Sequence, residues 1–210
     1  MNVDRAESQT RPADAVAPPS AIGGLRAATW PSHQRLEKRI DVKARFASVD
    51  AYRAHLENLL GFIAALEARI PVDLFGAALP DYPSRRKQGL LEQDLAALGL
   101  GPDAIAGLPR CPDVPAPRSI AEAFGCVYVL EGATLGGRTL LPVVTSRLTL
   151  DAGRGATFLA SYGESVAPMW GRFGIALDAW CCDAPRRDAA EATAVATFEA
   201  LERWLCRSRS

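Results

Sequence analysis

The clearest hydrophobic pattern in the chain follows Ser48. Apolar side chains recur there at alternating spacings of four and three residues, which places them on one face of an α-helix; they are Tyr52, Leu56, Leu59, Ile63, Leu66 and Ile70. Pro71 follows directly and predicts the end of this helix. A weaker pattern predicts an earlier helix over residues 25–40, and Pro31 inside it indicates either a bend or a helix that starts at the proline.

Helical patterns continue through the middle of the chain and are separated by proline-rich sequence. Residues 84–98 form the third predicted helix. Residues 99–118 contain five prolines, which predicts an extended connection. Ser119 and Glu122 then have the spacing of a capping box, so we expect a helix to begin there and to end before Pro142.

Two more helices are expected before the end of the chain. One covers residues 156–180 with a bend around Pro168, and the last covers residues 188–206. The best candidate for a strand is the segment at residues 143–145, which is only three residues long. The patterns therefore predict an all-α protein of about six to eight helices packed on one core.

Composition and charge narrow the class of protein further. Residues 1–22 combine prolines with mixed charges and predict a disordered tail, so the single helical domain is expected at residues 23–210. The 24 basic side chains balance 24 acidic ones, which argues against nucleic acid as a partner because phosphate binding usually needs a basic excess. No stretch approaches the ~18–20 apolar residues of a membrane span, and no secretory signal is recognisable. A cytoplasmic protein that does not enter membranes is predicted.

Few residues can supply metal or acid–base chemistry. The five cysteines are odd in number and scattered, which argues against both a disulfide framework and a structural zinc site. Only His33 and His55 carry an imidazole. In a helix His33 shares one face with Arg26, Trp30 and Glu37, so Glu37 could orient the ring, directly or through water, while Arg26 reaches a carboxylate of a ligand. A solvated polar face explains the same spacing, and His55 is expected at the surface or at its boundary.

Residues 128–138 form the second unusual segment, because a capped helix carries three glycines there within six positions. Each glycine destabilises a helix interior by about 0.5–1 kcal/mol relative to alanine. Gly132 and Gly136 lie one turn apart and, with Gly137, would permit a kink and leave a flat wall for a planar ligand. A close crossing of helices, or a helix that ends at Gly136, explains the glycines equally well.

Taken together, the two segments resemble heme oxygenases. That family typically has a basic residue seven positions before the histidine that ligates the heme iron and a glutamate four positions after it, as Arg26 and Glu37 stand to His33. The family's distal helix ends in a Gly-x-x-x-Gly-Gly pattern, which the three glycines match about 100 residues later. The amino-acid sequence of residues 128–137 and 158–163 looks most like the bacterial branch of the family that is found alongside bacteriophytochromes. The resemblance covers about residues 24–206.

The resemblance implies a heme-oxygenase-like helical bundle with an enzymatic activity. The enzyme would open heme b, which is both substrate and cofactor, to biliverdin, carbon monoxide and ferrous iron, using O2 and an external electron donor. A ferredoxin or another reductase would supply the electrons, and a bacteriophytochrome could receive the biliverdin. The resemblance makes His33 the iron ligand, Arg26 and Glu37 its supporting residues, and the glycines the distal wall.

Two features depart from the family pattern. Many heme oxygenases have an aspartate directly after the first distal glycine, where it orders water; here that position is Ala133. The distal proton network would then use water held by backbone carbonyls, with Arg138 or Glu131 as candidates. The basic residues of the family's penultimate helix, which face the heme propionates, have no clear match, and Tyr162 and Arg172 are the nearest substitutes.

Two other classes of function stay open on the sequence. Ala133 favours a heme-binding carrier or sensor without turnover. A helical protein of the same fold that binds no heme, as thiaminase-like relatives do, is the second. The pair Cys111-Pro112 resembles a heme-responsive thiolate motif, but this dipeptide is common and here lies in the proline-rich connection.

Overall fold

The computed structural model describes residues 20–207, and this part of the chain is helical without a strand. The all-α class is thus confirmed. The helices of ten or more residues are α1 (Ala21–Arg39), α3 (Val49–Glu67), α5 (Gln88–Ala97), α7 (Ile120–Leu148), α9 (Val166–Trp180) and α10 (Ala184–Leu205). Short helical segments connect them: α2 (Val42–Arg45), η1 (Gly76–Ala78), α4 (Tyr82–Arg85), α6 (Pro102–Ala106), α8 (Thr157–Ala160) and η2 (Gly163–Ser165).

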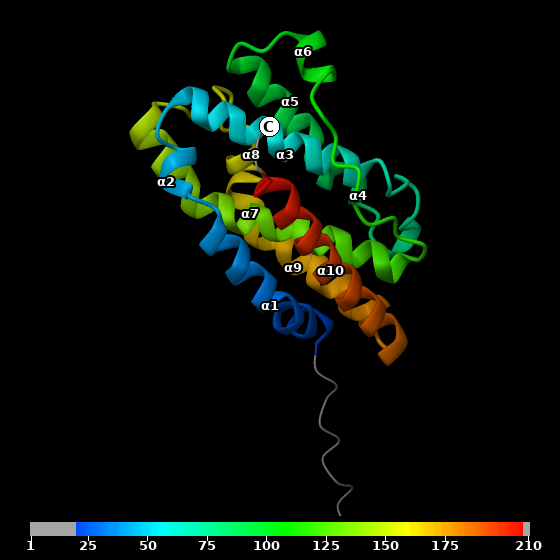
Figure 1. Ribbon diagram of the computed structural model, residues 1–210. Helices are drawn as coiled ribbons and strands as arrows, with labels where there is room; N and C mark the ends of the chain where they lie inside the picture. The colour runs from blue at the N-terminus through cyan, green and yellow to red at the C-terminus, as the bar shows by residue number, and fades with distance from the viewer. Residues whose placement is uncertain (1–19, 208–210) are drawn as a thin grey trace, which may run out of the picture.

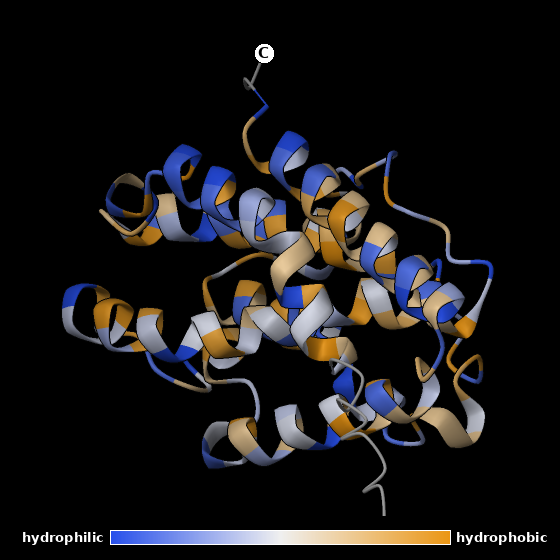
Figure 2. Ribbon diagram, turned by 90° about the horizontal axis from the view of Figure 1, so that it is seen from below, coloured by the Kyte–Doolittle hydropathy of each residue, from blue (hydrophilic) through white to orange (hydrophobic). Residues whose placement is uncertain are grey.

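The long helix α7 runs through the middle of the molecule (Figure 1). It packs against α10, α8 and α9, and α1 also packs against α10 and α9. Gly125 makes the crossing of α7 and α10 close, because a Cβ atom there would meet the Ala190 carbonyl oxygen at 2.3 Å. The helices carry both hydrophobic and hydrophilic positions around their axes, as amphipathic helices do (Figure 2). Helix α10 therefore packs against both α1 and α7.

The predicted stripe forms part of the core, although α3 ends at Glu67, before the predicted end at Pro71, and Ile70 lies beyond the helix. Five of its six members are buried: Tyr52, Leu56, Ile63, Leu66 and Ile70. Leu59 is only partly buried, and its neighbour Leu60 is completely buried instead. Since the buried face of α3 packs against α5 and α10, it is wider than a single stripe.

Two helices continue through a proline that the sequence suggested as a break. Helix α1 begins at Ala21, is capped by Ser20, and passes through Pro31. Helix α7 passes through Pro142 and ends at a left-handed Thr149, so the predicted end before Pro142 and the strand candidate at residues 143–145 are wrong. Both prolines are exposed, so the backbone carbonyls that lose a donor can bond to water, and burial of Val144 holds the last turns of α7 in place.

Other boundaries also differ from the prediction. The predicted helix over residues 156–180 is divided into α8 and α9, because Ser161 between them has a φ of 44°. Pro168 lies in the first turn of α9, where no backbone donor is needed. Helix α10 is capped by Asp183 and begins at Ala184, four residues before the predicted start at residue 188.

The remaining predicted segments show smaller differences. The third predicted helix begins as α4 and continues as α5, and the proline-rich connection contains the short α6. Residues 20–22 of the predicted tail belong to the cap and first turn of α1, and the rest of that tail lies outside the described residues. Within residues 20–207 no helix has both the length and the apolar character needed to cross a membrane.

Candidate functional site

A cavity of about 660 Å³ lies between α1 and α7, with α9 and α10 closing its inner side. This volume lies within the range of roughly 300–1,000 Å³ that is typical of small-molecule sites. The lining side chains are mostly apolar and aromatic, and its charged or titratable members are Arg26, His33 and Tyr128. Helices α1 and α7, which the sequence singled out separately, thus form the two walls of one cavity.

His33 reaches the cavity from the α1 wall. Its Nδ1 atom is buried and lies 3.6 Å from Oε2 of Glu37, the nearest carboxylate along the helix. The whole side chain is nevertheless 43% exposed, so the open part of the ring is the part away from Nδ1. Arg26 and Trp30 line the same wall, whereas Glu37 lies behind the histidine and not in the lining.

The α7 wall is flat because Gly132 and Gly136 have open space beside them. A Cβ atom at either position would have no heavy atom within 4 Å, and both residues line the cavity together with Ala133. Gly137 differs, since a Cβ atom there would lie 2.6 Å from the carbonyl oxygen of Leu159. The three glycines therefore divide between the two explanations: two open onto the cavity, and the third allows α7 to pack against α8.

Aromatic residues that sequence reasoning missed complete the lining. Tyr128 and Trp170 approach each other at 5.7 Å between ring centroids, and Phe198 contacts His33 from α10. Burial raises the pKa of Tyr128, and a hydrogen bond with Thr29 partly opposes this. Tyr128 lies one helical turn before Gly132, so helical spacing from the glycine could have identified it. Trp170 and Phe198 come from other helices, and only the tertiary structure brings them here.

Tyr162 and Arg172 do not line this cavity. The Tyr162 hydroxyl donates to Oε1 of Glu131 at 2.7 Å, and Arg172 faces a separate apolar cavity beside Ile175 and Trp180. Trp170 occupies the cavity side of α9, and a residue two positions later lies roughly 200° around a helix. The structure therefore does not bring these two predicted propionate-binding residues together with His33.

Glu131 belongs to a buried charge cluster behind the glycine wall. Its carboxylate accepts from Nη1 of Arg85 at 2.8 Å and from Nζ of Lys87 at 3.1 Å, and only 1% of its side chain is exposed. Lys87 also donates to the Tyr162 hydroxyl at 2.5 Å, and Arg85 pairs with Asp81. Burial lowers the pKa of Lys87, an effect that the Glu131 carboxylate opposes. Because Glu131 directly precedes Gly132, the cluster is attached to α7 immediately beside the flat wall.

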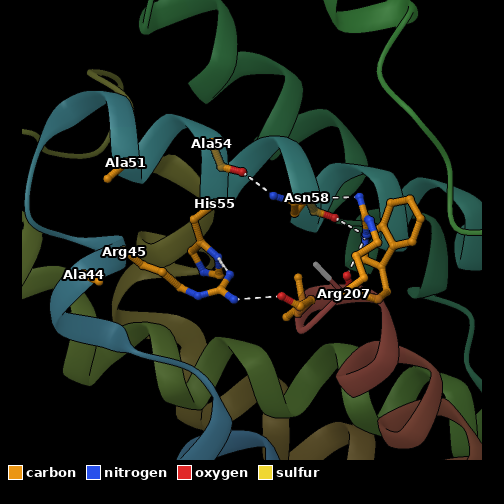
Figure 3. A pocket seen from close by; sticks show the side chains of 9 residues that line it. Ala44, Arg45, Ala51, Ala54, His55, Asn58 and Arg207 are labelled. Carbon is orange, nitrogen blue, oxygen red and sulfur yellow. Dashed lines mark hydrogen bonds between the residues drawn. The ribbon is translucent and has the colours of Figure 1, made fainter. Parts of the chain in front are cut away.

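The other candidate residues lie elsewhere. His55 borders a smaller cavity of about 310 Å³ at the ends of α2, α3 and α10, where its Nδ1 atom lies 2.9 Å from Nη1 of Arg45 (Figure 3). A guanidinium only donates, so Nδ1 accepts and the ring is neutral. Arg138 and Cys111 are absent from the lining of the main cavity. Among the described residues no three His, Cys, Asp or Glu side chains gather as a metal site.

Comparisons with known proteins show the family and the fold of this chain. The sequence model of the heme oxygenase family matches residues 21–207. The chain is 31% identical over 170 residues to the heme oxygenase PigA of Pseudomonas aeruginosa, which covers 79% of this chain and 83% of that protein.

Solved structures of two relatives have the same fold. The heme oxygenase of Leptospira interrogans superposes with a TM-score of 0.70 at 18% identity, over 89% of this chain and 98% of that one. The NO- and CO-bound heme oxygenase of Neisseria meningitidis superposes with a TM-score of 0.69 at 22% identity, over 90% and 91%. The match of the family across almost the whole described chain, with the identity to PigA, shows that this chain belongs to the heme oxygenase family of enzymes.

Proposed function

We propose that the chain binds heme b between α1 and α7 and degrades it to biliverdin, carbon monoxide and ferrous iron. The observation that carries the proposal is the position of His33, which lines one cavity with the open backbone of Gly132 and Gly136. A flat macrocycle needs two walls without intruding side chains and an imidazole on one of them. The apolar lining and the volume fit such a ligand, so the residues present suit heme.

On the α1 wall, the proposed task of the protein is to ligate the heme iron and to orient the heme. Neutral His33 offers Nε2 as an iron ligand when Nδ1 carries the proton. At 3.6 Å, Glu37 can accept from Nδ1 through a small movement or a bridging water. Arg26 lines the same wall, and its guanidinium suits a propionate carboxylate.

On the α7 wall, the proposed task is to exclude side chains and to hold water. Heme supplies the redox chemistry of iron with O2 when it is bound, and the protein supplies position and protons. Ala133 has no acidic group, and the carboxylate of Glu131 is bonded to Arg85 and Lys87. Water on the backbone carbonyls of α7 is therefore our candidate for the distal proton source, while the buried cluster keeps that backbone in place.

External partners complete the proposal. Electrons would come from a ferredoxin or another reductase, and the biliverdin would serve a bacteriophytochrome, as the branch that the sequence resembles implies. A cytoplasmic location fits both partners. A reconstituted reaction with ferredoxin and its reductase, followed by absorbance of biliverdin, tests the electron source.

A carrier or sensor without turnover is the second candidate, and Ala133 on the cavity wall is the observation that favours it. The two functions separate when hemin-loaded protein is reduced with ascorbate or ferredoxin under air. An oxygenase develops the absorbance spectrum of biliverdin, whereas a carrier returns to stable ferric or oxygenated heme.

The iron ligand is tested by replacing each histidine in turn. His33→Ala should abolish the absorbance and EPR signature of histidine-ligated ferric heme, because no other histidine lines the cavity. His55→Ala is the matched control and should leave this signature intact. Identical spectra from His33→Ala and the unmodified protein would refute the assignment.

A further inference from the structure

The His33 ring has no hydrogen bond that fixes its orientation. Its Nδ1 atom is buried but has no partner within hydrogen-bond distance among the described residues. Oε2 of Glu37 is 3.6 Å away, on a side chain that is 65% exposed. An exposed ionic contact between mobile side chains constrains geometry weakly. Something other than Glu37 therefore has to hold the plane of the imidazole.

Two aromatic rings from different helices confine the imidazole instead. Trp30, one turn earlier on α1, lies nearly parallel to it, with an interplanar angle of 8° and 5.9 Å between centroids. Phe198 on α10 meets it nearly edge-on, at 72° and 5.8 Å. Both geometries are favoured arrangements of aromatic pairs. A rotation of the imidazole about its Cβ–Cγ bond would lose the parallel stack and the edge contact together.

The exposure of Trp30 argues against a role in the core. Its side chain is 48% exposed, so removing the indole leaves no large buried void. Helix α1 continues through Trp30 and Pro31, so the position of the indole follows from the helix and the contacts of its ring. An exposed indole that is stacked on one particular imidazole has a position that burial alone does not explain.

We infer that Trp30 is a positioning residue that sets the plane of the His33 ring, with Phe198 as the second support. Glu37 then determines which nitrogen carries the proton, and Trp30 determines how the ring is turned. The inference rests on the proposed function, in which His33 ligates iron. The plane of an axial imidazole affects the splitting of the iron d orbitals, so the EPR g-values of low-spin ferric heme report it.

The test uses three variants and two spectroscopic measurements. Trp30→Leu removes the ring but keeps an apolar side chain, and Trp30→Phe restores an aromatic face. Trp180→Leu is the matched control, since Trp180 lies on α9 away from the main cavity and stacks on Arg186. Proton NMR of the heme-free protein measures the ring-current shifts of His33, and EPR of the hemin–cyanide complex measures the g-values. Only two histidines exist, so the His33→Ala variant assigns the signals.

We expect Trp30→Leu to move the His33 proton resonances toward random-coil values and to change or broaden the g-values. Hemin affinity should fall about two- to tenfold, the equivalent of one aromatic pair. Trp30→Phe should recover most of each signal, Trp180→Leu should change none, and the melting temperature of the heme-free Trp30 variants should stay close to that of the unmodified protein.

Three results would overturn the inference. One is that the His33 resonances do not move in Trp30→Leu. The second is that they move while the g-values stay constant, and the third is that both change only along with a large loss of thermal stability. A wrong iron ligand is a separate outcome. In that case His33→Ala retains the histidine-ligated spectrum, while the NMR shifts of the heme-free protein still report the stack.

Discussion

The two histidines differ in whether a ring nitrogen is available to a ligand, and the neighbouring side chains explain this difference. His33 lies on a cavity wall between Trp30 and Phe198, with its open edge available to a ligand. His55 accepts from the guanidinium of Arg45 at the end of α2 and is committed to that contact. One imidazole is suited to ligation, and the other is suited to a structural role.

His55 should make the stability of the protein depend on pH. Burial, with a smaller contribution from Arg45, lowers the pKa of His55 from 6.5 to about 3. The unfolded chain therefore binds a proton below about pH 6.5 that the folded chain refuses until about pH 3, so this contribution is complete above pH 6.5 and is lost as the pH falls. The slope is at most about 1.4 kcal/mol per pH unit. Urea unfolding of the protein and of His55→Gln between pH 7 and 4 measures it.

His55→Gln keeps an acceptor for Arg45 and removes the titration. Its free energy of unfolding should decline less steeply with falling pH than that of the unmodified protein. Parallel curves across this range would mean that His55 titrates normally in the folded chain.

Arg26 should contribute to ligand binding through its charge. It lines the cavity two turns before His33, and a charge-assisted contact with a propionate contributes about 1.5–3 kcal/mol. Arg26→Glu should therefore weaken hemin binding roughly ten- to a hundredfold in a Soret titration, or change the biliverdin isomer. Lys38→Glu makes the same charge change on α1 outside the lining and should have little effect. Equal losses from both variants would indicate a general effect of surface charge.

Local spacing was sufficient to predict that Arg26, His33 and Glu37 share one face of a helix, because residues one and two turns apart lie on the same side. It was insufficient for Tyr162 and Arg172. Tyr162 bonds to Glu131 from the turn after α8, and Arg172 lies on the side of α9 turned from the cavity. Their directions depend on how the helices are rotated against one another, which no local pattern contains.

At the scale of elements, α7 shows which sequence signals were decisive. The capping box at Ser119 and Glu122 fixed its start, as predicted. Pro142 did not end it, because a proline on an exposed face loses one hydrogen bond that water replaces, while Val144 on the buried face keeps its packing. A proline signal therefore depends on the burial of the helix face, which the sequence gives only indirectly.

The same helix allows one substitution to be compared at three positions. Gly132→Leu and Gly136→Leu place a side chain in open space, so the heme-free protein should keep its stability or gain up to about 1 kcal/mol from helix propensity. Hemin affinity and turnover should fall. Gly137→Leu drives a side chain into the Leu159 backbone and should destabilise the heme-free protein by about 1–3 kcal/mol or more.

Thermal melts of the heme-free variants beside hemin titrations separate these effects. Gly137→Leu serves as the internal control, since it also replaces a glycine of α7 by leucine. A large loss of stability from Gly132→Leu or Gly136→Leu, with normal heme binding and normal biliverdin formation, would defeat the idea of a distal wall.

At the scale of the molecule, α10 contributes to the site by packing against both α1 and α7 and by lining the cavity between them. Helical periodicity predicted the all-α class and most of the long helices, since each must bury one apolar face. It could not predict which two helices would leave space between them. The resemblance to heme oxygenases indicated that the helices of His33 and of the three glycines face each other. The structure adds the buried charge cluster around Glu131, which lies beside the glycine wall.

Removing one member of the buried cluster should destabilise the protein strongly, because the cluster joins four parts of the chain. Arg85 comes from α4, Lys87 from the start of α5, Glu131 from α7 and Tyr162 from the turn after α8. Neutralising the carboxylate leaves two buried cations short of a partner, and breaking a buried pair in this way typically destabilises by about 3–5 kcal/mol. Glu131→Gln should show a loss of this order in urea unfolding of the heme-free protein.

Asp151→Asn is the matched control, because it makes the same carboxylate-to-amide change in a pair with Arg154 that is exposed to solvent. An exposed pair contributes about 0–1 kcal/mol, so this variant should unfold almost as the unmodified protein does. Glu131 directly precedes Gly132. In Glu131→Gln the backbone amide protons of Gly132 and Gly136 should therefore exchange with deuterium faster than in the unmodified protein. Equal free energies of unfolding for the two variants would show that the cluster does not brace α7, and the rigidity of the cavity wall would then have to come from the packing of α7 against α8 and α10.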